Sequence, residues 1–161
     1  MNISWDFSEV LEFSERLLKF DVYCEKAAKE IAEKLHQMLI NNTPVDFGML
    51  QAFWKTEENY SYVAERVENG FEITLVNKAT YALWVNDGHK QRPGRFIPGY
   101  WMGNHFRYDP TADGGMRLKK SEVKGRFFVE TSIAQLENSV TIESIVQKQL
   151  KKCFRWCVDG K

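Results

Sequence analysis

The hydrophobic positions of the first forty residues recur with the period of an α-helix. Charged residues fill the positions between them, so one face of the predicted helix is apolar and the opposite face is solvated. A break or bend is expected near Phe20-Asp21, and the helix should end at Thr43, because Pro44 disfavours the helical conformation of the residue before it. The apolar face consists of Phe7, Val10, Leu11, Leu17, Leu18, Cys24, Ala27, Ala28, Ile31, Leu35, Met38 and Leu39.

Two later segments, 60–67 and 71–76, alternate apolar and polar residues as β-strands do. Asn69-Gly70 lies between them, and this dipeptide strongly favours a tight hairpin turn. The apolar run 81–85 is expected to alternate across a sheet as well. A last strand is expected at 122–126, followed by helical spacing over 127–157 with a cap or bend at 139–141.

The segment 87–120 has no regular period and contains three of the four prolines and six of the ten glycines. These residues argue against a long helix, so a long loop is expected. The segment is also rich in aromatic residues, and its seven basic residues outnumber its three acidic ones. Aromatic residues and arginine with few acids are the composition of the core of a protein–protein interface.

These elements predict an α+β fold in one domain spanning residues 1–161. A small antiparallel β-sheet packs against the long N-terminal and C-terminal helices, and the loop at 87–120 projects from this domain as an assembly arm. In an isolated chain the loop is expected to be mobile or folded back and to become ordered on docking.

The composition of the chain argues against several classes of protein. The chain has 22 basic and 22 acidic residues, whereas proteins that coat nucleic acid usually carry a basic surplus. The N-terminus lacks the pattern of a signal peptide, and no apolar stretch has the length of a membrane helix, so an intracellular protein without membrane contact is expected. The three cysteines are an odd number and are expected to be free thiols.

Candidate catalytic residues are few. Asp87, His89 and His105 could bind zinc or iron in a small nuclease or hydrolase, but the spacing matches no known ligand motif. Arg92 and Arg95, with the aromatic residues around them, could instead contact phosphates and bases in a nucleic-acid-binding module. Phosphate-binding glycine loops and nucleophile motifs are absent from the sequence. We therefore expect no enzyme activity, no cofactor and no metal.

Three stretches together resemble a known family. The residues Thr43-Pro44-Val45-Asp46-Phe47-Gly48-Met49-Leu50, Tyr81 to His89, and Gly125-Arg126-Phe127-Phe128 are similar, in this order, to motifs of tail-completion proteins of tailed bacteriophages. These head–tail joining or neck proteins occur in HK-type siphophages, in prophages and in phage-tail-like bacteriocins. Phe47 and the pair Asn86-Asp87 depart from the family pattern, and the segment 87–120 is longer than in short members.

The resemblance implies a structural protein that assembles into a ring, commonly of six copies, between portal-side connector proteins and the tail tube or tail terminator. It implies assembly in the host cytoplasm and a final place in the virion or phage-tail-like particle, with nucleic-acid contact only incidental. Residues expected to be structural within the motifs are Thr43, Pro44, Asp46, Gly48, Tyr81 and Gly88. Asp46 is expected to cap the helix after the turn, and Gly48 and Gly88 to need positive φ or close backbone approach. The expected interface consists of Arg92, Arg95, Phe96, Tyr100, Trp101, Phe106 and Tyr108.

Overall fold

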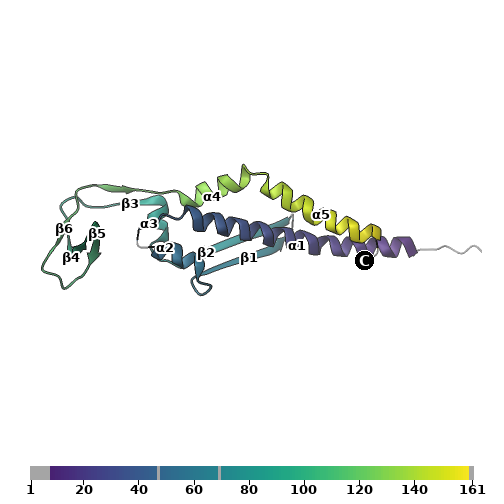
Figure 1. Ribbon diagram of the computed structural model, residues 1–161, viewed down its shortest axis with the longest axis horizontal. Coiled ribbons are helices and arrows are strands. Elements are labelled where there is room, and N and C mark those ends of the chain that lie inside the picture. Colours follow the sequence, from purple (N-terminus) through teal and green to yellow (C-terminus); the bar gives the residue numbers. More distant parts are fainter. Residues whose placement is uncertain (1–7, 47, 69, 160–161) are drawn as a thin grey trace, which may run out of the picture. The chain divides into compact units, whose positions relative to one another are not determined.

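A computed structural model describes the backbone of residues 8–46, 48–68 and 70–159, and the side chains of residues 20–46, 48–68 and 70–154. The chain divides into two units (Figure 1). The first, here called the body, consists of Met1–Ala79 and Phe128–Lys161. The second, here called the arm, consists of Thr80–Phe127 and contains the whole 87–120 segment. The expectation of a single domain stays a prediction, and each unit is described by itself.

The body is built around helix α1 (Ser8–Asn42), which contacts the short helix α2 (Met49–Lys55) and the strands β1 (Tyr60–Val67) and β2 (Gly70–Asn77). Helices α4 (Phe128–Glu137) and α5 (Thr141–Asp159) also pack along α1 (Figure 1). Small residues on α1 allow the neighbouring helices to approach closely, and Ala32 is completely buried. The buried apolar residues of the body are Ala27, Ala28, Ala32, Leu39, Leu50, Trp54, Ala79, Phe128, Leu136, Ile145 and Cys153.

Helix α1 is continuous through Phe20 and Asp21, so the expected bend there is wrong. Neither residue breaks a helix as proline would, and the Asp21 carboxylate forms an ion pair with the Arg66 guanidinium on β1. The polar residue that interrupted the apolar pattern therefore has a partner on the hairpin.

Strands β1 and β2 form the predicted antiparallel hairpin, with Tyr60 opposite Asn77 and Val67 opposite Gly70. Alternate residues of β2, from Phe71 to Asn77, are half-buried, and the intervening ones are exposed. One face of the hairpin thus packs against α1 and the other is open to solvent. The C-terminal helical pattern is confirmed as α4 and α5; they are interrupted at 138–140, one residue before the cap or bend expected at 139–141.

The arm begins with helix α3 (Ala82–Asp87), so the strand expected at 81–85 is wrong. A short apolar run has no period that distinguishes a strand from a buried helix. Strand β3 (Gly88–Lys90) then pairs antiparallel with β7 (Glu122–Lys124), which confirms the last predicted strand.

The segment 87–120 is not a structureless loop. Strands β4 (Phe96–Met102), β5 (His105–Tyr108) and β6 (Gly115–Arg117) form a three-stranded antiparallel sheet in the order β5-β4-β6. The segment forms no long helix, as its glycines and prolines predicted, but these residues mark turns between short strands instead of one loop. The α+β class is confirmed: helices supply most of the buried apolar residues of the body, and the sheets found among the described residues are small and antiparallel.

Candidate assembly surface on the arm

The first motif closes the C-terminal end of α1. Thr43 is 2% exposed, and its hydroxyl donates a hydrogen bond of 2.5 Å to the Leu39 carbonyl oxygen, which also accepts from the Thr43 amide at 2.9 Å. The preceding Asn42 donates from Nδ2 to Ser132 Oγ at 3.0 Å and to Gln135 Oε1 at 2.8 Å, which ties α1 to α4. Thr43 therefore has a structural role, and Pro44 directly follows the end of the helix.

Gly48 occupies the N-cap position of α2 with φ of 74°, a conformation that glycine adopts without steric cost. This confirms the positive φ expected from the motif. Asp46 is exposed and lies two residues before the N-cap, and its capping role stays a prediction.

The second and third motifs meet at the base of the arm, although 36 residues lie between Gly88 and Gly125 in the chain. The Arg126 amide donates to the Val85 carbonyl oxygen at 3.0 Å, and the Phe127 amide donates to the Asn86 carbonyl oxygen at 2.9 Å. The two ends of the arm are thus joined by backbone hydrogen bonds.

Both glycines at this base are required by close backbone approach. Gly88 has φ of 78°, and a Cβ atom there would lie 2.3 Å from the Val123 carbonyl oxygen. A Cβ atom on Gly125 would lie 2.3 Å from the Asn86 carbonyl oxygen. Phe127 adopts φ of 49°, which costs a non-glycine residue about 1–2 kcal/mol. The base therefore depends on tight packing of two strand ends, as the Gly88 prediction anticipated.

The three-stranded sheet of the arm has two chemically different faces. Residues directly opposite each other in the register share a face: Phe96 with Arg117, and Tyr100 with Arg107. We call this the basic face; it consists of Phe96, Pro98, Tyr100, Met102, His105, Arg107, Gly115 and Arg117. The opposite face, called the aromatic face, consists of Ile97, Gly99, Trp101, Phe106, Tyr108 and Met116.

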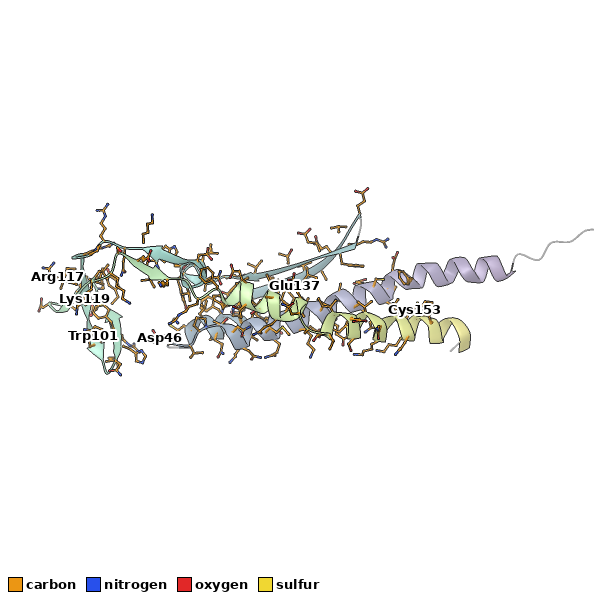
Figure 2. All side chains as sticks on the ribbon, turned by 90° about the horizontal axis from the view of Figure 1, so that it is seen from above. Asp46, Trp101, Arg117, Lys119, Glu137 and Cys153 are labelled. Atoms are coloured by element: carbon orange, nitrogen blue, oxygen red, sulfur yellow. The ribbon has the colours of Figure 1, made fainter. Side chains whose placement is uncertain are left out.

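Ring contacts agree with this assignment. The Arg117 guanidinium carbon lies 5.7 Å from the Phe96 ring centroid, and a Cβ on Gly115 would lie 2.5 Å from the same ring. On the other face, the Trp101 and Phe106 rings meet edge to face at 5.4 Å, and Phe106 covers Gly99. Figure 2 labels Trp101 and Arg117 at this sheet.

The arm exposes several large apolar side chains. Phe96, Tyr100 and Trp101 are 45%, 48% and 57% exposed, and Tyr108 is 66% exposed. Helix α3 adds Leu83 and Trp84 at 72% and 63%. The arm contains nine basic and four acidic residues, a surplus of five positive charges, so the body of this neutral chain carries five negative charges in excess.

The seven residues expected to form the interface do not form one patch. Phe96 and Tyr100 lie on the basic face, while Trp101, Phe106 and Tyr108 lie on the aromatic face. Arg92 and Arg95 lie in the turn between β3 and β4, where the Arg95 amide donates to the Arg92 carbonyl oxygen at 3.2 Å. Phe106 is half-buried and the other six are exposed. Arg107, Arg117 and Trp84 were not among the expected residues, because only the register and the exposure of α3 bring them to the surface in question.

Tyr81, the first residue of the second motif, is half-buried at the N-cap of α3. Burial raises the pKa of its phenol above the usual value of 10.0.

The residues considered for a metal-dependent hydrolase are not assembled into a site. Across the residues that the structure describes, no three His, Cys, Asp or Glu side chains are grouped so that they could hold a metal ion. His89 lies opposite Val123 in the β3–β7 pair, with its ring 6.2 Å from that of Trp84, and His105 lies opposite Met102 on the basic face. None of the described helices has a segment apolar and long enough to cross a membrane.

The comparisons with known proteins agree with the motifs. Residues 9–88 match the family model described as "Bacteriophage HK97-gp10, putative tail-component". Over these residues the chain is similar to this family of phage tail components. Over 135 residues, 81% of this chain and 83% of the relative, it is 27% identical to the phage-like element PBSX protein XkdI of Bacillus subtilis strain 168.

A second relative from the same strain, the uncharacterized protein YqbI, is 28% identical over 146 residues, 84% of this chain and 86% of the relative. No solved structure matches the chain. The family model and the two relatives therefore support a structural protein of a phage or phage-like element.

Proposed function

We propose that this protein is a neck subunit, a tail-completion protein that assembles into a ring, most naturally of six copies, between the portal-side connector and the tail tube or tail terminator. The arm forms the subunit contact. The observation that carries this proposal is the arm's sheet, which presents exposed aromatic and arginine side chains on a base closed by backbone hydrogen bonds. Assembly takes place in the host cytoplasm, and the ring then stays in the particle.

The energetics of the arm support this role. Exposed aromatic clusters are unfavourable in water and usually mark surfaces that another molecule covers. Burying a single aromatic anchor at the centre of an interface is worth roughly 2 kcal/mol or more. Because the arm is already folded into strands, docking requires less ordering of the chain than docking of a mobile loop would, and more of that energy remains as affinity.

The proposal is tested by changing Tyr100 and Trp101 together to Ala. These neighbours lie on opposite faces of β4, so the double change removes an exposed aromatic ring from each face. We expect the variant to keep the secondary structure and thermal midpoint of the parent and to lose ring formation, measured by analytical ultracentrifugation, and incorporation into particles.

The matched control changes Val140 and Phe154 to Ala in the body, where these side chains are 79% and 61% exposed. It should assemble normally, since neither side chain belongs to the arm. Unfolding of the Tyr100/Trp101 variant would mean that these rings support the fold. Normal assembly and incorporation of that variant would place the subunit contact outside the arm.

A further inference from the structure

The hairpin of the body presents a second exposed face, which carries valine and glutamate side chains. We call it the hairpin outer face; its residues alternate with those that pack toward α1 and are all exposed. Val63, Val67 and Val76 are 45%, 41% and 44% exposed. The hairpin outer face consists of Ser61, Val63, Glu65, Val67, Glu72, Thr74 and Val76.

Two acidic side chains lie side by side on this face. Glu65 is directly opposite Glu72 in the register, and like charges in such a pair destabilise a hairpin. None of the seven residues of the face is basic. Three valines and two facing carboxylates would be stabilised by a surface that brings both apolar cover and positive charge.

The basic face of the arm has these properties. Phe96, Tyr100 and Met102 supply apolar area at 45–50% exposure. Arg107 and Arg117 flank them on the outer strands, and no acidic residue lies on the face. The guanidinium group suits this role, because it binds carboxylates through two parallel hydrogen bonds and packs against aromatic rings, as Arg117 does on Phe96.

We propose that the basic face of one copy's arm docks on the hairpin outer face of a second copy. The inference rests on the proposed ring and names the partner surface within it. Each subunit gives one arm and receives one, so the contact is head-to-tail, which is the type of interface that closes into a ring. The opposite net charges of arm and body favour this pairing between copies over contact between two arms or two bodies.

A charge-exchange experiment tests the pairing. One variant carries Arg107→Glu and Arg117→Glu in the arm, and the other carries Glu65→Arg and Glu72→Arg in the hairpin. In either variant alone, arm and hairpin have the same charge, so the concentration needed for half-maximal self-association should rise roughly tenfold or more. Mixed in equal amounts, each arm meets a hairpin of opposite charge, and association should return toward the parent value.

Matched controls reverse charges outside the two faces. Lys119→Glu with Lys120→Glu changes two exposed bases of the arm, and Glu57→Arg with Glu137→Arg changes two exposed acids of the body. Both should associate nearly as the parent does. Because Arg117 also donates to the Gly94 carbonyl oxygen at 3.0 Å, its reversal could disturb the arm. Arg107→Glu alone, with the Glu65→Arg single variant, repeats the exchange without touching that bond.

The outcomes separate this inference from the proposed function. Loss of assembly by the Tyr100/Trp101 variant, with unchanged association of both charge variants, would keep the arm as the assembly element and overturn the hairpin as its partner. Weakened variants whose mixture is not restored would overturn the pairing as well. The pairing would also be overturned if the parent protein stayed monomeric up to the concentrations at which it enters particles. If the arm variant loses a salt-dependent DNA shift shown by the parent and keeps its self-association, the basic face is assigned to nucleic acid.

Discussion

At the scale of single residues, the arm depends on glycines where two backbone segments touch. Gly88 was expected from the motif to have positive φ, and its φ of 78° confirms this. Gly125 and Asn86 could not be assigned a role from the sequence, because the Gly125 backbone approaches the Asn86 carbonyl oxygen from 39 positions away in the chain. Asn86 is 5% exposed and donates from Nδ2 to Asp87 Oδ1 at 2.7 Å, so the departure Asn86-Asp87 from the family pattern forms a local hydrogen-bonded pair.

Gly88→Ala should open the base of the arm. The new methyl group meets backbone atoms that cannot move aside, in addition to the cost of positive φ, so we expect a loss of about 2 kcal/mol or more. Hydrogen exchange at the Arg126 and Phe127 amides, which bridge the base, measures this opening directly.

Gly94→Ala is the control for that change. Gly94 has φ of 84°, close to that of Gly88, but nothing lies within 4 Å of a Cβ placed there. Its substitution should cost only the backbone term, about 1 kcal/mol, and leave exchange at Arg126 and Phe127 unchanged. Equal effects of the two substitutions would show that crowding at Gly88 is unimportant.

At the scale of elements, the packing of α1 on α5 includes a polar contact. Glu30 on α1 accepts from Lys148 Nζ at 2.6 Å and from Gln149 Nε2 at 3.0 Å on α5. These hydrogen bonds hold the pKa of the Glu30 carboxyl below its usual value of 4.5. A carboxyl with a lowered folded-state pKa stabilises the fold above its unfolded pKa, and this stabilisation is lost as the pH falls through the folded value.

Glu30→Gln should therefore lower stability at pH 7 by less than about 1 kcal/mol, because the Lys148 side chain is 52% exposed. The difference between parent and variant should shrink as the pH falls below about 4.5. Urea unfolding at several pH values measures it. Glu25→Gln is the control, since the ion pair of Glu25 is with Lys29, within α1; a pH dependence as large as that of Glu30→Gln would contradict the assigned cause.

Two elements show where local pattern was insufficient. The hairpin and helices α1, α4 and α5 carry periodic patterns, and these elements were assigned correctly, the hairpin to within one residue at each end. The run 81–85 is too short to carry a period, and it became α3. Helix α1 runs without a break through Phe20 and Asp21, and Asp21 pairs there with Arg66, which is distant in sequence.

At the scale of the whole molecule, the residues of the arm follow the hairpin and precede the C-terminal helices in the sequence. The β3–β7 pair, with Lys90 opposite Glu122, resembles the stem of a hairpin that needs only a turn. Joining Lys90 to Glu122 through Asn-Gly, in place of residues 91–121, should give a protein whose body unfolds at nearly the parent temperature.

This shortened protein should not form rings, because both faces of the arm's sheet are gone. Calorimetry measures the unfolding temperature of the body, and analytical ultracentrifugation measures ring formation. If the parent unfolds in one transition and the shortened protein no longer shows it, the chain is one cooperative domain. If the shortened protein keeps the transition of the body unchanged, body and arm are two separate units. Rings formed by the shortened protein would contradict the proposed function of the arm.

The sequence by itself determined the long helices, the hairpin, the α+β class, the position of the turn glycines and the resemblance to phage tail proteins. These follow from periods and motifs that are local along the chain. Only the tertiary structure decided that the segment 87–120 is a sheet, because its short strands are defined by their partners and not by their own pattern. It also decided which side chains share a face: Tyr100 and Trp101 are neighbours in sequence, yet the pleat of β4 places Tyr100 with Arg107 and Trp101 with Phe106.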